Sequence, residues 1–101
     1  MWVIAMFDIP VTTPTDRRSA SQFRKLLLDD GFFMLQYSIY GRPCNCEAHA
    51  KLHRDTIRSH LPANGQVRII TITERQFSTM ENYVGKLPKT PENNNEQLFI
   101  F

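Results

Sequence analysis

The amino-acid sequence predicts an α+β domain in which four antiparallel strands carry two helices on one face of their sheet. Three observations support this fold class. The chain has 101 residues, which is the usual size of one domain. Its apolar residues alternate between the runs typical of strands and the three-to-four-residue spacing typical of helices. These segments follow one another in the order βαββαβ, so we expect a ferredoxin-like sandwich.

The first strand and the first helix are predicted from the N-terminal third of the chain. Residues 2–7 are continuously apolar, which predicts a buried strand that closes at a turn over residues 8–10. We expect Thr15 to cap a helix over residues 16–30, which ends at Gly31. At about 100° per residue, one side of this helix is apolar. The predicted inner residues are Ala20, Phe23, Leu26 and Leu27.

The middle of the chain predicts two or three further elements. Residues 32–42 are rich in aromatic and β-branched side chains, which indicates one long bent strand or two short strands. We expect Asn45 to cap a second helix over residues 46–61, and residues 66–73 to form the last core strand. The predicted inner residues of this helix are Cys46, Ala50, His53, Ile57 and Leu61.

The C-terminal part predicts an extension of the domain. We expect a turn over residues 74–79 and a short strand over residues 80–84, so that the ferredoxin-like domain covers residues 1–85. Residues 86–101 then form a Pro- and Asn-rich linker and a strand-like tail. The tail is apolar and is expected to add an extra strand to its own subunit or to a partner. Its residues are Leu98, Phe99, Ile100 and Phe101.

Composition excludes several classes of protein. A hydrophobic share of 42% with 22% charged residues is incompatible with a disordered chain. The longest apolar run is far shorter than a membrane span of about 20 residues, and no signal peptide is recognised. Two cysteines separated by one residue do not make a disulfide framework, so we expect a reducing, cytoplasmic setting. The net charge of +2 is too small to indicate nucleic-acid binding without local clustering.

Asp8 is the first candidate functional residue. It ends an apolar strand, so its carboxylate lies at the rim of the sheet, where it can bind a hard cation. The alternative is that Asp8 only starts a turn. One carboxylate is a poor Mg²⁺ site. The sheet face without helices favours a homodimer, however, and a two-fold dimer can bring two copies of Asp8 together.

Basic side chains on the first helix form a second candidate site. They lie within about a third of a turn of one another and suit contacts with nucleic-acid phosphates. The alternative is a solvated helix face. The cluster consists of Arg17, Arg18, Arg24 and Lys25, and Arg42, Lys51, Arg54 and Arg58 are expected to extend it.

A third pattern is the sequence C-x-C-x₂-H-x₃-H, formed by Cys44, Cys46, His49 and His53. Common zinc sites separate the Cys pair from the His pair by a dozen or so residues, whereas here all four lie within one short stretch. We therefore favour buried cysteines and surface histidines over a metal site. Ser38 lacks an adjacent base and is interpreted as a strand residue.

Three segments together resemble a known family. They are Met6-Phe7-Asp8-Ile9-Pro10, Leu35-Gln36-Tyr37-Ser38-Ile39-Tyr40, and residues 65–77. With these segments at their mutual spacing, residues 1–85 resemble the small CRISPR-associated endonucleases, the lesser of the two adaptation proteins (the Cas-two family). The third segment and the short chain look most like members from type II systems.

This resemblance implies a ferredoxin-like homodimer in which the aspartate matching Asp8 of each subunit binds a divalent metal, usually Mg²⁺. Family members are described as metal-dependent phosphodiesterases that act on RNA or DNA. They are also the central dimer of a heterohexameric spacer-integration complex, flanked by the integrase partner and crossed by duplex DNA. Arg17 and Arg18 match basic family positions, and the apolar tail matches a partner-binding segment. Gly41 departs from the family, since many members have an acidic residue there.

Three functions follow from the sequence and the resemblance. The first is a metal-dependent endonuclease that uses Asp8. The second is a non-catalytic DNA-binding scaffold for the integrase. The third is a toxin-type ribonuclease on the same fold, which acts without an integrase.

Overall fold

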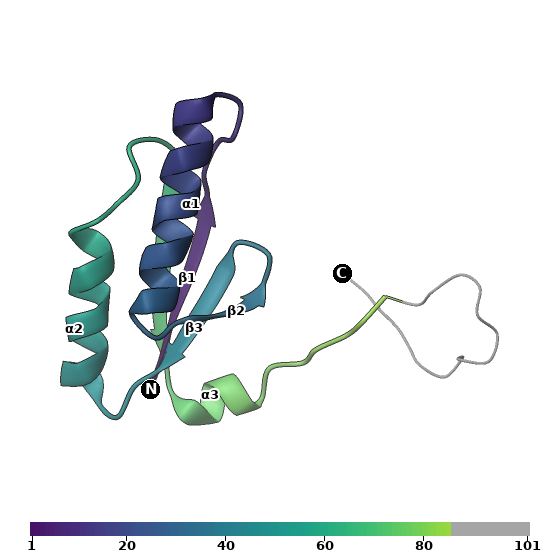
Figure 1. Ribbon diagram of the computed structural model, residues 1–101. Coiled ribbons are helices and arrows are strands. Elements are labelled where there is room, and N and C mark those ends of the chain that lie inside the picture. The colour runs from purple at the N-terminus through teal and green to yellow at the C-terminus, as the bar shows by residue number, and fades with distance from the viewer. Residues whose placement is uncertain (86–101) are drawn as a thin grey trace.

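The computed structural model describes residues 1–85 and confirms the α+β, ferredoxin-like fold (Figure 1). The elements are β1 (Trp2–Asp8), α1 (Pro14–Asp29), β2 (Phe33–Gln36), β3 (Ile39–Pro43), α2 (Glu47–Arg58), β4 (Gln66–Ile72) and α3 (Glu74–Ser78). The strands pair antiparallel in the order β2-β3-β1-β4. The predicted linker and the tail residues Leu98, Phe99, Ile100 and Phe101, with their expected extra strand, lie outside the described residues.

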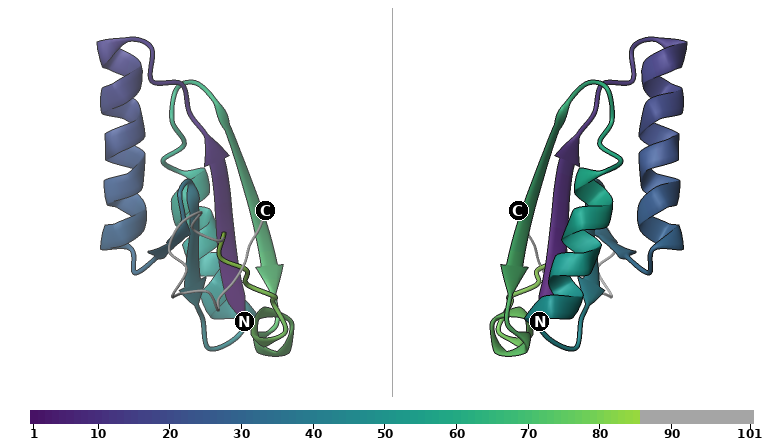
Figure 2. Two further views of the ribbon diagram at one scale, coloured as in Figure 1. Left: turned by 90° about the vertical axis from the view of Figure 1, so that its right-hand side faces the viewer. Right: turned by 90° about the vertical axis from the view of Figure 1, so that its left-hand side faces the viewer.

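The two faces of the sheet differ in what covers them. Val3, Ala5 and Phe7 of β1 join the hydrophobic core beneath α1 and α2, which lie over the same face (Figure 2). Side chains alternate between faces along a strand, and residues paired across a sheet share a face. We call the face that neither α1 nor α2 covers the open face. On β1, β3 and β4 its residues are Trp2, Ile4, Met6, Asp8, Ile39, Gly41, Pro43, Gln66, Arg68, Ile70 and Ile72.

The core confirms most of the predicted inner faces of the two helices. Its helix residues are Ala20, Phe23, Leu27, Ala50, His53 and Ile57. Leu26 is partly buried against this core. Cys46 and Leu61 are exposed, contrary to the prediction, because α2 spans only Glu47–Arg58 and both residues lie outside it.

The predicted helix caps are wrong by one or two residues. Thr13, not Thr15, caps α1, since its hydroxyl accepts a hydrogen bond of 3.0 Å from the Asp16 N–H. Pro14 then takes the first helical position, where its missing N–H leaves nothing unpaired. Asn45 does not cap α2. Cys46 occupies that position without a side-chain hydrogen bond.

The segment after β4 also differs from the prediction. Residues 74–79 contain the short helix α3, which begins with a capping box between Thr73 and Gln76. The stacked rings of Phe77 and Trp2 hold α3 at one end of the open face, with centroids 3.7 Å apart. The predicted strand over residues 80–84 is wrong. This segment leaves α3 beyond the end of the sheet, pairs with no described strand and is exposed.

We also compared the helices of the described residues with what a membrane span requires. None of those in residues 1–85 is both long enough and apolar enough to cross a bilayer.

Candidate functional site

Asp8 lies at the exposed end of β1, opposite Gln66 of β4. No Lys, Arg or His of the described residues forms an ion pair with its carboxylate. The backbone around it is fixed by Gly65, whose φ of +98° favours glycine. A Cβ at position 65 would overlap the Asp8 carbonyl oxygen and lie 2.9 Å from the Ile9 Cα. The carboxylate is therefore free to bind a ligand, while its backbone is held in place.

The turn between β2 and β3 closes over the same end of β1. The Phe7 N–H donates a 3.0 Å hydrogen bond to the Ser38 carbonyl oxygen, which ties the turn to the residue before Asp8. Ser38 has a φ of +65°, so it is a turn residue and the predicted strand assignment is wrong. A residue other than glycine in this region costs of order 1–3 kcal/mol, and such strain gathers at functional sites. The two short strands confirm one of the two alternatives expected for residues 32–42.

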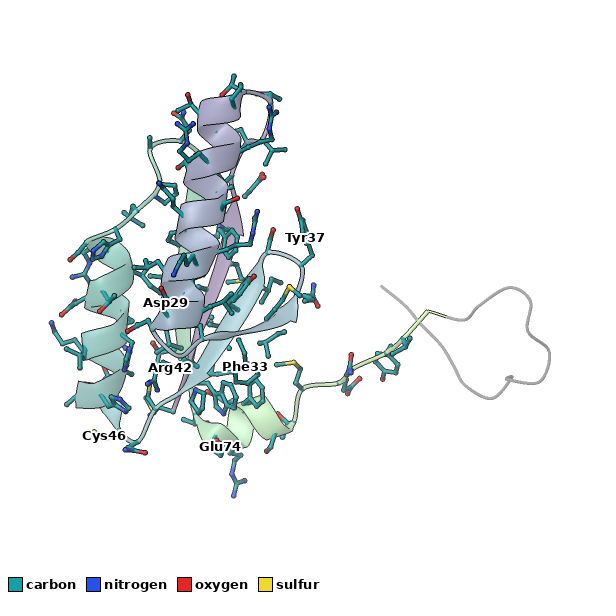
Figure 3. The ribbon with its side chains drawn as sticks, viewed as in Figure 1. Asp29, Phe33, Tyr37, Arg42, Cys46 and Glu74 are labelled. Carbon is teal, nitrogen blue, oxygen red and sulfur yellow. The ribbon has the colours of Figure 1, made fainter. Side chains whose placement is uncertain are left out.

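A hollow of about 290 Å³ lies between these segments. Three separate parts of the chain contribute polar side chains to it: the end of β1, the β2–β3 turn and β4. Tyr37 is 77% exposed and projects from the tip of the turn (Figure 3). The lining residues are Met6, Phe7, Asp8, Tyr37, Ser38, Ile39, Gln66 and Arg68. A carboxylate, a guanidinium, an amide, a phenol and a hydroxyl thus surround one open concavity, which we call the Asp8 hollow.

The basic residues of α1 do not line the Asp8 hollow. Arg17 and Arg18 lie at the start of α1, toward the end of the molecule where β1 stops (Figure 1). Both are exposed, and the Arg17 guanidinium donates to the Val11 carbonyl oxygen at 3.1 Å. Arg24 is half-buried farther along the helix. Lys25 forms an ion pair of 2.8 Å with Asp29, and this hydrogen bond raises the pKa of the Lys25 ammonium.

Arg18 borders a separate hollow of about 440 Å³ between α1 and residues 60–63. Phe23, Leu26 and Leu61 supply apolar surface to this hollow. Arg17 and Arg18 are thus exposed at the start of α1, and they do not line the Asp8 hollow.

Arg42 and the basic residues of α2 are engaged within the fold. Arg42 donates from Nε to the Asp30 carbonyl oxygen and from Nη1 to the Pro43 carbonyl oxygen, both at 2.8 Å. It thereby ties the end of α1 to β3 (Figure 3). Lys51 and Arg58 both pair with Asp55, and Arg54 pairs with Glu47 and donates to Thr71. These partners neutralise much of the predicted extension of the basic surface.

The two histidines of the Cys/His pattern form a hydrogen-bond chain. The Asn45 backbone N–H donates to His49 Nδ1 at 3.1 Å, so His49 carries its proton on Nε2. That proton faces His53 Nε2 at 3.1 Å, which must then accept it. His53 Nδ1–H in turn donates to the Asp30 carboxylate at 2.7 Å. All four ring nitrogens thus take part in hydrogen bonds.

The two cysteines of this pattern differ in exposure. Cys44 is buried, whereas Cys46 is exposed at the start of α2 (Figure 3). Within residues 1–85, no three His, Cys, Asp or Glu side chains converge as a metal site. Cys44 is therefore buried as expected and His49 is half-buried, but the expectation is wrong for Cys46, which is exposed, and for His53, which is buried.

Sequence reasoning missed Arg68, Gln66 and Tyr37 as neighbours of Asp8. Alternation along residues 66–72 places Gln66 and Arg68 on one face, and an arginine inside a β-branched strand is itself a signal. What joins them to Asp8 is the pairing of β4 with β1, a register that spans more than 50 residues of chain. Gly41, the position where the family pattern departs, pairs with Ile4, which lies four residues from Asp8 on β1. That separation is about 13 Å along a strand.

Comparison with known proteins gives consistent results. A family model described as CRISPR associated protein Cas2 matches residues 1–80. A Parvibaculum lavamentivorans protein named CRISPR-associated endoribonuclease Cas2 is 46% identical over 101 residues, which cover all of both chains. A Flavobacterium psychrophilum protein of the same name is 43% identical over 101 residues, covering 100% of this chain and 88% of the relative.

A solved structure supports the fold independently. A crystal structure of Streptococcus pyogenes Cas2 at pH 6.5 matches with a TM-score of 0.63 and 19% sequence identity, over 84% of this chain and 100% of that one. At this identity the likeness bears on the fold alone.

Proposed function

The chain belongs to the CRISPR associated protein Cas2 family, and from that premise we propose that it is a metal-dependent endonuclease of CRISPR adaptation. It hydrolyses phosphodiester bonds of RNA or DNA at a site built on Asp8. The observation that carries this proposal is the free, exposed carboxylate of Asp8 on the open face. Relatives named endoribonucleases support the reaction class.

The active form in this proposal is a homodimer that pairs two open faces. A sheet face without covering helices presents apolar surface to water, and a second copy can bury it. Ile4 is already buried by its neighbours, but Ile70 is 49% exposed. Because an interface around a two-fold axis places the same residue on both sides of it, pairing of the open faces can bring Asp8 of each subunit to one site.

The residues around Asp8 fit a hard divalent cation. Carboxylate, amide and hydroxyl oxygens are the ligands that Mg²⁺ prefers, with several waters and usually one or two carboxylates. One Asp8 hollow contributes a single carboxylate, and two subunits contribute two. Asp8 of each subunit would hold the ion. An Mg²⁺ ion held there would polarise a phosphoryl oxygen of the substrate and would lower the pKa of a water molecule bound to it.

The test of this function compares the wild type with Asp8→Asn and Asp8→Ala on labelled RNA and DNA, with and without Mg²⁺. We expect both variants to lose metal-dependent cleavage and to remain dimers. Glu81→Gln is the matched control, because it removes an exposed carboxylate outside the Asp8 hollow. Cleavage by Asp8→Asn at the wild-type rate would show that the activity belongs to another nuclease.

A second candidate function is a non-catalytic scaffold that binds duplex DNA and the integrase in a heterohexameric complex. The exposure of Arg17 and Arg18, with no acidic partner among the described residues, favours DNA binding at the start of α1. In this function Asp8 is dispensable for spacer insertion, whereas Arg17→Ala combined with Arg18→Ala lowers it. Capture of the integrase by the full chain separates both functions from a toxin-type ribonuclease.

A further inference from the structure

The Asp8 hollow contains one basic side chain, Arg68, alongside its carboxylate. Arg68 is exposed and forms no ion pair with any acidic residue of the described chain. The other basic candidates for phosphate contact lie on α1, donate to carbonyl oxygens as Arg42 does, or pair with acidic residues of α2. Among the described residues, the basic side chain that lines the Asp8 hollow is therefore one that the sequence did not single out.

The register of β1 and β4 sets the distance between these two groups. Asp8 pairs with Gln66 and Met6 pairs with Arg68, so Asp8 and Arg68 are diagonal neighbours on the open face. Diagonal neighbours in an antiparallel pair lie about 7–8 Å apart. Both side chains can therefore reach one group placed between them, although they do not pair with each other.

The chemistry of the hollow favours a phosphodiester as that group. A guanidinium binds phosphate oxygens through two parallel N–H donors, and it remains charged at any pH in the physiological range. A carboxylate repels a phosphate unless a divalent cation lies between them. A divalent cation on Asp8 with a guanidinium beside it would hold a phosphate from two sides.

We propose that Arg68 binds the substrate phosphate at the Asp8 site, so that the substrate-binding cation of this site comes from β4 and not from α1. This inference rests on the proposed function and adds a substrate-binding residue to it. Arg17 and Arg18 then contact the part of the nucleic acid that lies outside the Asp8 hollow. The competing arrangement is an ion pair between Arg68 and Asp8 of a second copy across the dimer interface.

Two measurements test Arg68 independently of each other. The first is kcat/KM for cleavage by the wild type, Arg68→Ala, Arg68→Lys and the control Arg75→Ala. The second is the Kd for a labelled RNA oligonucleotide in the Asp8→Asn background with Mg²⁺, where cleavage is blocked, over a series of salt concentrations. Arg75 lies exposed on α3 outside the hollow, so its removal changes the net charge equally.

We expect Arg68→Ala to lower kcat/KM and to weaken binding by about 10- to 100-fold, the loss expected for a hydrogen bond to a charged group. The slope of log Kd against log salt should fall by about 0.7–0.9, which corresponds to one phosphate contact. Arg68→Lys should restore the slope and only part of the affinity. Arg75→Ala should stay within about threefold of its parent in both measurements.

Equal behaviour of Arg68→Ala and Arg75→Ala in binding and cleavage would overturn the inference. So would a larger dimer dissociation constant for Arg68→Ala, measured by sedimentation, with binding per dimer unchanged, because that result assigns Arg68 to the interface. If the wild type does not cleave, the proposed function fails. The binding arm still decides whether Arg68 contacts phosphate.

Discussion

The hydrogen bond between Asp30, at the end of α1, and His53 predicts that the substitution Asp30→Ala lowers the free energy of unfolding substantially. His53 donates from Nδ1 to the Asp30 carboxylate, and the His53 side chain is only 10% exposed. Removing the acceptor leaves a buried N–H without a partner. Hydrogen bonds to charged groups are worth about 1.5–3 kcal/mol, so we expect the free energy of unfolding to fall by about 2 kcal/mol. For a domain of this size, that loss lowers Tm by about 10 °C.

The assay is urea and thermal unfolding of both proteins at one fixed concentration, because dimerisation makes stability depend on concentration. Asp29→Ala is the matched control. It removes the neighbouring carboxylate, whose only ion pair among the described residues is with the exposed Lys25. Exposed pairs are worth about 0–1 kcal/mol, so the control should change little. Asp30→Asn keeps one acceptor oxygen and should lose less than Asp30→Ala.

The hydrogen-bond chain also predicts the tautomers of His49 and His53. Ring ¹⁵N shifts should show His49 protonated on Nε2 and His53 protonated on Nδ1. Equal destabilisation by Asp29→Ala and Asp30→Ala, or the opposite tautomers, would mean that His53 does not donate to Asp30 in solution.

Three further predictions concern other parts of the fold. Gly65→Ala places a Cβ on a residue with φ of +98° and against the end of β1. We expect it to lower the free energy of unfolding by about 1–3 kcal/mol, measured by unfolding, and to lower the rate of cleavage, measured by kinetics. Phe77→Ala removes the ring stacked on Trp2, the only tryptophan, so the emission of Trp2 should shift to longer wavelength, while Tyr83→Ala should leave it unchanged. The hydrogen bond from Arg54 lowers the pKa of Glu47 below its ordinary value. The pair therefore adds stability at pH values above the ordinary pKa of a glutamate, and this stability is lost as pH falls through the lowered pKa. Glu47→Gln should flatten the acid side of the stability profile.

Each of these predictions has a result that contradicts it. Wild-type stability in Gly65→Ala would mean that the backbone at the end of β1 is not held as the structure has it. An unchanged spectrum of Phe77→Ala would remove α3 from its contact with Trp2. An acid profile of Glu47→Gln that matches the wild type would show that its pair with Arg54 does not persist in solution.

The sequence predicted those parts of the fold that depend on local spacing. The inner residues of α1 recur at helical spacing. Residues 2–7 are apolar on both sides because β1 contacts the core with one side and forms part of the open face with the other. The short helix α3 could also have been predicted from the sequence, because Thr73 and Gln76 have the spacing of a capping box.

What the sequence could not supply was register and competition between neighbours. Thr13 and Thr15 are equally good caps, and the position of Pro14 decides between them. Asn45 was a sound cap candidate, but α2 begins at Glu47, so Cys46 takes the cap position and Asn45 lies one residue before it. Asp8 was predicted from its place at a strand end, whereas Arg68 joins it only through the β1–β4 pairing. Long-range pairing of this kind leaves no local pattern.

The central claim is that two chains share one divalent ion between their Asp8 carboxylates. The most direct test is the stoichiometry of Mn²⁺, used in place of Mg²⁺, bound to the full chain by calorimetry and by electron paramagnetic resonance. We expect one ion per two chains for the wild type, and loss of that ion in Asp8→Asn with the dimer intact. One ion per chain, or undiminished binding by Asp8→Asn, would contradict it.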